Sequence, residues 1–593
     1  QVSLGKGSVT EVAVDNDTVT SAPDAQEQLV SKVEVVGKEV FLQEDSLIRA
    51  PSGEVVITAT DSPDNPMLTS NRNDSYIYMH EGSVIDVSGS DTAILPMERN
   101  SVAVELRSNE LADSPLQRDG VLRGETVYVE LRKGTDLVDY SGAVAVIEKT
   151  VAERLASGGQ IDIRSEGDFV QRDGALLDIS GGKVTYADGF VKETRLVSDG
   201  QIINISDADK YRQYDAILGV NSKTHDRWAI TETYFSNITA ANGRFVNSFV
   251  EGKSAGTVNI EAAASLLAKD GISADTIIGP YQNNTDALAE QGLVNIDLKK
   301  FNDGTQAVTF TADSLVEAIT DSLAKTPDAV TLQRDRLTND LVLPDNYMKR
   351  NGIGELSISS NGAVVIEDSA TVSADAGSNI DLTGTSVNVE GDIVTHGGDV
   401  SLSSVALITG DRADLTVADG TVIDVSGLWI NNTEFVGGPD TNFPDVIDGG
   451  DISITAEGDV TVGDSALLNA SGGAKLDTDY EITAGEGGDI SLIARHKDGA
   501  DLSIQGEVQS YSLTSGGTLH LEAAEVLVTN EPVAAAMNQL VVSQDDFTTG
   551  GFSRYEVVAN AGDMVVDAVL KPIMQNYGFD SSASSLSTAS QNH

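Results

Sequence analysis

The sequence predicts an all-β protein, a right-handed parallel β-helix (solenoid) that carries an irregular α+β insertion. Three observations predict it: an internal repeat, short apolar alternations of period two, and a composition rich in Gly but poor in aromatic residues. The chain has 593 residues, beyond the roughly 250–300 at which a single compact core stops growing. Its 56 Gly and 5% aromatic residues favour an elongated array over a string of ordinary globular domains.

The internal repeat is the strongest of these observations. Residues 158–183 align without a gap on residues 449–474, with 14 identities in 26 positions. The opening of this unit, Gly-Gly-Asp followed by alternating apolar residues, recurs at 397–402 and 487–492. Self-similarity of this kind is typical of solenoids, in which each repeat is one structural unit stacked on the next.

Each unit contains strands too short to be stable alone. Ile452 and Ile454 flank one polar residue, as do Val460 and Val462, and Gly, Asp, Asn and Ser punctuate the intervals. Apolar residues at every second position predict strands, and the Gly, Asp, Asn and Ser between them predict tight turns. Stacked coils would point these apolar residues inward and hydrogen-bond to their neighbours at about 4.8 Å. If roughly 400 residues lie in coils of ~20–25 residues each, the chain forms about 16–20 coils.

The array divides into sections. We predict a first β-helix section over 1–200, an insertion over 201–355 and a second β-helix section over 356–575. Within the insertion, the spacing of apolar residues predicts a short amphipathic helix near 313–325. The small polar residues of 576–593 predict a flexible tail.

Aromatic residues concentrate outside the predicted coils. We expect the insertion to have a small core of its own and to present binding surfaces, together with the excursions 61–75 and 429–448. The aromatic residues that cluster in 211–249 are Tyr211, Tyr214, Trp228, Tyr234, Phe235, Phe245 and Phe249.

One slot of the repeat is acidic. Asp86, Asp178, Asp424 and Asn469 occupy it. Acidic β-helices of the RTX kind bind Ca²⁺ through the nonapeptide GGxGxDxUx, which the chain lacks. We therefore predict that these side chains accept hydrogen bonds from backbone N–H groups at a corner of the coil.

A second calcium candidate lies in the acidic loop that contains Asp440, Asp445, Asp448 and Asp451, because Ca²⁺ binds several carboxylate and carbonyl oxygens. A solvated acidic loop is the alternative, and we predict no cofactor while leaving calcium open.

Catalytic motifs are missing from the sequence. No HExxH, G-x-S-x-G, P-loop or G-x-G-x-x-G is present. We therefore predict no catalytic, cofactor-binding or metal-binding residues, and we expect His520 to face solvent from a strand. The histidines are His80, His225, His396, His496, His520 and His593.

Charge restricts the partners. The chain has 38 Lys+Arg and 92 Asp+Glu, a net charge of −54, and no Cys. Nucleic-acid binders need a basic face, so a nucleic-acid partner is excluded. We find no run of about 18 apolar residues, and we expect the chain not to be membrane-embedded.

Several segments carry a family resemblance: GSVIDVSGSD (82–91), the stretch from LPMERN to YVELR (95–132), HDRWAITETY (225–234), FVEGKSAGTVNIEAAA (249–264) and GGFSRY (550–555). With these residues the chain resembles the filamentous haemagglutinin-type exoproteins of Gram-negative two-partner secretion systems, over most of its length. The family's signal peptide and N-terminal secretion domain are not seen, so we expect an internal section of a longer fibre.

The resemblance implies a secreted, cell-surface, non-enzymatic adhesin that attaches to cells or biofilm matrix. Its implied partners are an outer-membrane secretion pore during export and a glycan, a protein receptor or a biofilm exopolysaccharide. Two alternatives stay open. One is a passive spacer within a larger fibre, and the other is a β-helical protein that binds or degrades polysaccharide with paired carboxylates roughly 5–9.5 Å apart.

Overall fold

A computed structural model describes most of the chain. The described residues are 1–13, 21–23, 29–65, 74–107, 109–218, 220–225, 230–235, 243–282, 288–299, 305–317, 319, 337, 339–431, 445–476, 480–531, 533–572, 574–579 and 588–592. Strands predominate, and the α-helices in these ranges are short: α1 (Ser141–Ala145), α2 (Val151–Arg154) and α3 (Tyr347–Asn351).

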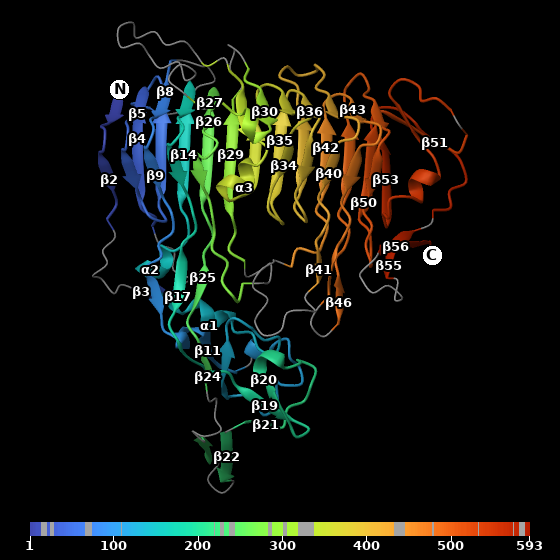
Figure 1. Cartoon of the computed structure of the whole chain (residues 1–593). Helices are drawn as coiled ribbons and strands as arrows, with labels where there is room; N and C mark the ends of the chain where they lie inside the picture. Colours follow the sequence, from blue (N-terminus) through green and yellow to red (C-terminus); the bar gives the residue numbers. More distant parts are fainter. Residues whose placement is uncertain are drawn as a thin grey trace.

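A 12-stranded sheet, in which every described neighbour is parallel, runs the length of a rod (Figure 1). This sheet confirms the predicted parallel β-helix. Its strands, in spatial order, are β4 (Lys32–Gly37), β7 (Glu54–Ala59), β14 (Gln160–Ser165), β26 (Thr257–Ala262), β29 (Gly292–Leu298), β32 (Ile353–Ser359), β35 (Asn379–Gly384), β38 (Val400–Ser404), β42 (Ile452–Ala456), β47 (Ile490–Ala494), β50 (Thr518–Ala523) and β53 (Arg554–Ala559).

Shorter parallel strands form the second side of the rod. One sheet contains β1 (Val2–Leu4), β5 (Glu39–Leu42), β8 (Tyr76–Met79), β15 (Asp168–Gln171) and β27 (Ala264–Leu266). The next contains β31 (Leu341–Pro344), β30 (Val308–Thr311), β33 (Val364–Ile366), β36 (Val387–Val389), β39 (Leu415–Val417), β43 (Val460–Val462) and β48 (Leu502–Ile504).

The third side of the rod is interrupted by helix α3. Its first sheet contains β2 (Val9–Glu11), β6 (Leu47–Arg49), β9 (Val84–Asp86), β16 (Leu176–Asp178) and β28 (Ile272–Ser273). Its second contains β34 (Thr371–Ser373), β37 (Asp392–Val394), β40 (Val422–Asp424), β44 (Leu467–Asn469) and β49 (Glu507–Gln509). Between them, Asn351 of α3 accepts backbone hydrogen bonds from Ile272 through its side chain (3.2 Å) and from Ala274 through its carbonyl (2.9 Å).

The core of the rod consists of inward-facing aliphatic residues in columns. Along β42 the apolar residues are buried and the polar ones between them are half-buried. Ile454 pairs with Leu402 on one side and Leu492 on the other, and all three are fully buried. Because the column is narrow, aliphatic side chains fill it and few aromatic rings are needed.

Fewer coils are stacked than predicted. The longest described sheet has 12 strands rather than 16–20, because many coils carry long loops. Val400, for example, pairs with Ile452, fifty-two residues further along the chain. The prediction assumed that every coil was as short as the one between Ile380 and Val400.

Backbone-to-backbone contact explains the repeated Gly-Gly-Asp. A Cβ atom on Gly450 would lie 2.1 Å from the carbonyl oxygen of Gly398, and one on Gly488 would lie 1.9 Å from that of Gly450. A real Cβ does not approach an oxygen so closely, so only glycine permits successive coils to meet here.

The Asp of the same motif joins one coil to the next. The Asp399 carboxylate accepts a hydrogen bond from the Asp451 backbone N–H (2.8 Å), and Asp451 accepts one from that of Asp489 (2.7 Å). Asp489 in turn accepts from Thr518 (2.6 Å). Burial, followed by the neighbouring charges of Asp399 and Asp489, raises the pKa of Asp451. Part of the large acidic excess is therefore structural.

We expect Asp489→Ala to lower the free energy of unfolding by about 1–2 kcal/mol, because the Thr518 N–H loses its acceptor. Denaturant unfolding followed by circular dichroism measures this change. Asp489→Asn is the control: its amide oxygen can take the same bond, as the side chain of Asn379 does for the Asp399 N–H (2.9 Å). Equal losses in both variants would contradict the role given to the hydrogen bond.

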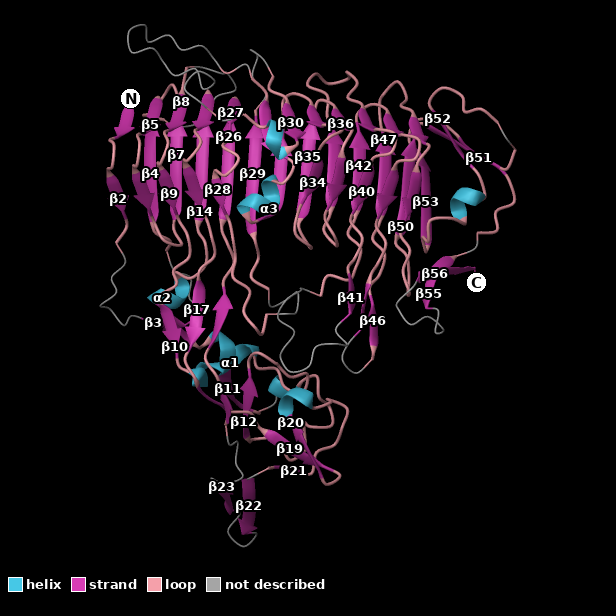
Figure 2. Cartoon of the chain, in the orientation of Figure 1, coloured by secondary structure: helices cyan, strands magenta, loops and turns pink. Residues whose placement is uncertain are grey.

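Two excursions from the rod form a separate body (Figure 2). The first runs over 93–156, between β9 and β14, and the second over 183–252, between β16 and β26. We call the body built by these two excursions the extra-helical domain.

The boundaries of this domain differ from the predicted insertion over 201–355. Strands β26, β29 and β32 all belong to the 12-stranded sheet, so much of 256–359 lies in the rod. Conversely, 93–156 lies outside the rod although it was predicted to belong to it. Period-two alternation is the same in a rod strand and in an antiparallel hairpin, and the sequence does not distinguish them.

Two smaller elements also differ from expectation. In place of the first turn of the helix predicted near 313–325, Asp313–Leu315 form a 3₁₀ turn, and most of 318–336 lies outside the described residues. In the predicted flexible tail, β55 (Gln575–Phe579) pairs antiparallel with β56 (Thr588–Asn592). The segment predicted as a tail thus contains a described strand pair.

Candidate functional site

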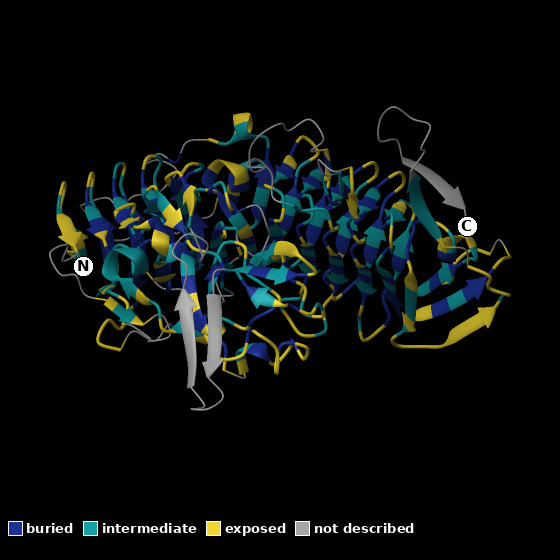
Figure 3. Ribbon diagram, turned by 90° about the horizontal axis from the view of Figure 1, so that it is seen from below, coloured by how far each residue is buried: buried dark blue, intermediate teal, exposed yellow. Residues whose placement is uncertain are grey.

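The extra-helical domain has a hydrophobic core distinct from that of the rod, whose buried residues follow its whole length in Figure 3. An antiparallel pair, β11 (Ser101–Glu105) and β12 (Thr126–Glu130), comes from the first excursion. β19 (Arg195–Ser198), β20 (Gln201–Asn204) and β21 (Ala216–Ile217) come from the second. The core residues are Val102, Val104, Leu106, Leu111, Leu122, Val127, Val129, Leu137, Val138, Leu196, Ile205, Ala208, Tyr214 and Ile217.

A buried arginine fixes this domain against the rod. The Arg132 guanidinium lies over the rings of Phe249 (5.1 Å) and Tyr281 (4.3 Å), and Tyr281 belongs to the loop between the rod strands β28 and β29. Arg132 also forms an ion pair with Glu130, a buried carboxylate 3.5 Å from Arg244. Cation–π contacts of a desolvated cation stabilise such a junction by about 2 kcal/mol.

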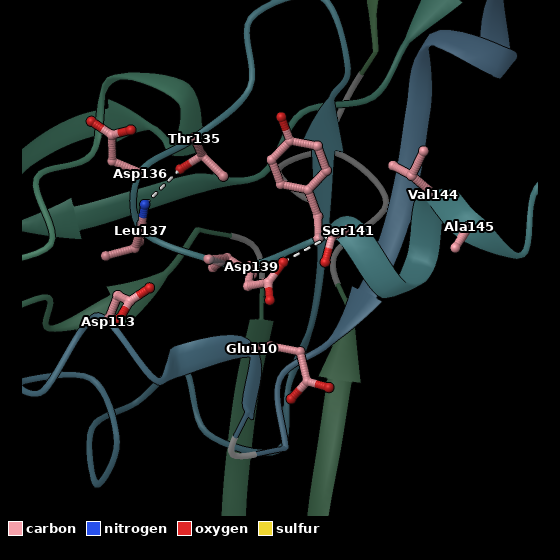
Figure 4. Close-up of a pocket in the computed structure, with 11 residues that line it drawn as sticks. Glu110, Asp113, Thr135, Asp136, Leu137, Asp139, Ser141, Val144 and Ala145 are labelled. Carbon is pink, nitrogen blue, oxygen red and sulfur yellow. Dashed lines mark hydrogen bonds between the residues drawn. The ribbon is translucent and has the colours of Figure 1, made fainter. Parts of the chain in front are cut away.

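A pocket of about 580 Å³ opens in the extra-helical domain, within the size range of small-molecule sites (Figure 4). Helix α1 and the loop before it form one wall, and the segment around Glu110 forms another. Its lining residues are Glu110, Asp113, Thr135, Asp136, Leu137, Val138, Asp139, Tyr140, Ser141, Val144 and Ala145.

Hydrogen bonds to the backbone hold the pocket walls together. The Asp139 N–H donates to the carbonyl of Glu110 (2.8 Å), and the Ser114 hydroxyl donates to the carbonyl of Leu137 (2.7 Å). The Thr135 hydroxyl donates to the carbonyl of Ile205, which lies on the second excursion (2.6 Å). Both excursions therefore determine the shape of the pocket.

The pocket is acidic. It contains the carboxylates of Glu110, Asp113, Asp136 and Asp139, and its described lining includes no Lys, Arg or His. Hydrogen bonds from Ser141 lower the pKa of Asp139 and keep that carboxylate ionised. As an ionised carboxylate, Asp139 can accept hydrogen bonds from hydroxyl or ammonium groups.

The acidic slot of the repeat is structural, as predicted. In Asp86, Asp178, Asp424 and Asn469 the side-chain oxygen accepts a hydrogen bond from the backbone N–H two residues later. The distance is 3.0 Å from Ser88, Ser180 and Ser426, and 3.2 Å from Ser471. These turns form the corners after β9, β16, β40 and β44.

The acidic loop considered for calcium does not form a common site among the described residues. Asp445 pairs with Lys475 (2.9 Å), and Asp448 accepts a hydrogen bond from the Glu486 N–H (2.8 Å). Asp451 belongs to the carboxylate series described above, and Asp440 lies outside the described residues. Within the part of the chain that the structure describes, no group of three or more His, Asp or Glu could hold a metal ion.

The histidines whose side chains the structure describes contact different parts of the chain. His396 and His496 contact the carbonyls of Ser426 (3.1 Å) and Gly410 (3.2 Å). His520 faces outward from β50, as predicted, beside the Glu556 carboxylate (3.1 Å). His80 packs on Tyr78 with ring centroids 4.5 Å apart. The His225 side chain and His593 lie outside the description.

The aromatic residues of the second excursion divide between core and surface. Tyr214 and Phe249 are buried, whereas Tyr211 and Phe245 are exposed. Trp228 and the side chains of Tyr234 and Phe235 lie outside the description. Sequence reasoning missed the pocket carboxylates; their one signal was the spacing of Asp136 and Asp139 beside Tyr140.

Comparison with known proteins yields no match to a family model, to a curated protein or to a solved structure. The strand order defines the fold by itself as a parallel β-helix, with an extra-helical domain that has its own core. None of the helices in the described residues has the length and apolarity to cross a membrane.

Proposed function

We propose that the chain is a section of a secreted, cell-surface filamentous adhesin of a Gram-negative bacterium, exported through an outer-membrane pore and without enzymatic activity. In this proposal the rod is a scaffold, and the extra-helical domain binds a glycan or a protein receptor on cells or biofilm matrix. The observation that carries it is the acidic pocket in a domain with its own core, displaced from the rod.

Two features support a binding role. Arg132 of the domain contacts Tyr281 of the rod, so a ligand bound to the domain would be connected to the rod through this junction. The pocket combines apolar side chains, such as Val144, with four carboxylates. This combination suits a ligand that presents hydroxyl or ammonium groups from an apolar frame.

A passive spacer is the second candidate function. The outer face of the long sheet supports it, because small polar residues such as Ser401, Ser453 and Ser491 stand side by side there. A face of that kind offers regular solvated surface rather than a built site.

The adhesin proposal predicts that neutralising the pocket abolishes attachment. The variant carries Glu110→Gln, Asp113→Asn, Asp136→Asn and Asp139→Asn in the full chain. Beads coated with it should bind epithelial cells and bacterial biofilm at least about tenfold less than beads coated with the unaltered chain, because charge-assisted hydrogen bonds to the ligand are lost. Retained beads are counted after washing.

A matched control separates the site from the overall charge. Glu81→Gln, Asp368→Asn, Asp411→Asn and Asp563→Asn remove the same charge from exposed positions on the rod, and attachment should persist. Unchanged attachment by the pocket variant would favour the spacer. Deleting 205–250 is a poorer test, because it removes Ile205 and Tyr214 from the domain core.

A further inference from the structure

A second protrusion stands beside the extra-helical domain, on the same side of the rod (Figures 1 and 2). It is a three-stranded ribbon of β41 (Trp429–Asn431), β45 (Ala474–Leu476) and β46 (Ile482–Ala484). β41 pairs parallel with β45, and β45 pairs antiparallel with β46. Along β41 the outer two residues are exposed and Ile430 is buried, so Trp429 and Asn431 share one face.

Three aromatic rings from distant segments meet at this ribbon. The ring of Tyr577, on β55, lies 5.9 Å from that of Trp429 and 5.4 Å from that of Tyr511, centroid to centroid. Trp429 remains 41% exposed despite these contacts. A large aromatic side chain at this exposure, supported by two others, marks a surface for contact rather than a core.

Hydrogen bonds hold the Tyr511 ring through its hydroxyl and the Tyr577 segment through its backbone. The Tyr511 hydroxyl accepts a hydrogen bond from the Gly550 N–H (3.1 Å) and lies 3.4 Å from the side-chain oxygen of Gln575. The Tyr577 N–H donates to the carbonyl of Ser512 (2.8 Å). The surface is therefore formed before a ligand arrives, which lowers the entropy cost of binding.

The charged groups around the rings are already engaged. Lys475 pairs with Asp445 (2.9 Å), and the Asp424 carboxylate accepts hydrogen bonds from the Ser426 N–H and the Asn469 amide, both at 3.0 Å. This patch therefore offers aromatic faces, hydroxyls and amides, and the Asp424 carboxylate beside it is already hydrogen-bonded within the protein.

We propose that Trp429, supported by Tyr577 and Tyr511, is a stacking site for a neutral carbohydrate. The C–H face of a pyranose ring would pack on the exposed indole, and its hydroxyl groups would meet polar neighbours such as Asn431. Nucleic-acid bases also stack on aromatic rings, but the charge of the chain excludes a phosphate backbone. The role of this site in attachment rests on the proposed function. Its binding of carbohydrate is tested separately.

The experiment uses the fact that the chain has only two tryptophans, Trp228 and Trp429. A Trp228→Phe chain reports the environment of Trp429 alone. It is titrated with hexamers of β-linked glucose and of β-linked N-acetylglucosamine. We expect a saturable blue shift with at least one hexamer. In calorimetry, Trp429→Ala and Tyr577→Ala should each lower the affinity at least about tenfold.

Phe245→Ala is the matched control. Phe245 is 52% exposed and packs on Phe190 in the extra-helical domain, and its removal should leave the affinity for the hexamers unchanged. The proposal is overturned if neither hexamer gives a saturable change, or if Trp429→Ala binds as well as the unaltered chain. A response only to an apolar peptide would also overturn it. The pocket variant should keep its hexamer response, so the two proposals fail separately.

Discussion

Replacing Gly450 with alanine is expected to lower the free energy of unfolding by about 3 kcal/mol. The added Cβ would lie 2.1 Å from the Gly398 carbonyl oxygen, and because that oxygen belongs to the backbone, a side-chain rotation does not relieve the contact. Two coils would have to separate, which places the cost at the upper end of that for overpacked cores. Guanidinium unfolding followed by circular dichroism measures the loss.

Gly142→Ala serves as the control for this substitution. Gly142 lies in α1, and a Cβ there meets no atom within 4 Å. Alanine is the better helix former by about 1 kcal/mol, so stability should stay the same or rise slightly. A Gly450→Ala chain as stable as the control would refute close coil contact as the reason for the repeated glycine.

Ile454→Asp is expected to cost more than about 4 kcal/mol and to unfold the coils around it. Ile454 is fully buried between Leu402 and Leu492, so the new carboxylate would have neither water nor a partner. Because each coil contacts only its neighbours, the damage should be local. Hydrogen exchange should show lost protection in β38, β42 and β47 while β7 stays protected.

Ser453→Asp introduces the same group one residue earlier on the outer face. Ser453 is half-buried beside Ser401 and Ser491, so water can reach the new carboxylate. The change in stability should stay within about 0.5 kcal/mol. Similar losses in the two variants would contradict the assigned inward and outward faces of β42.

The rod was predictable because its strands and turns depend on short sequence patterns that recur in each coil. The alternation from Ile452 to Val462 predicts both the strands and their buried faces, and the structure confirms them. The role of Asp178 and its equivalents followed from turn chemistry alone. The Gly-Gly-Asp motif was visible as well, but its cause, carbonyl contact between successive coils, became clear only from the structure.

The boundaries of the extra-helical domain and its pocket were not predictable from the sequence. Val102 and Val129 alternate with polar residues as rod strands do, yet they pair antiparallel in the domain. The pocket depends on Thr135 reaching Ile205, seventy residues away. Residues so far apart become neighbours through tertiary packing, for which the chain offers no local pattern.

Helix α3 gives the rod an uneven resistance to tension. Hydrogen bonds between coils run along the rod axis, so a pull on its ends is shared by the sheets that cross each coil boundary. At α3 no strand ladder of the described residues crosses the third side; it connects through Asn351 to β28 and its loop, through the Arg350–Asp270 ion pair (2.7 Å), and through the Asp345 carbonyl to the Ser373 N–H (3.1 Å). We therefore expect a pull along the rod axis to stretch this boundary before boundaries that strand ladders cross on every side.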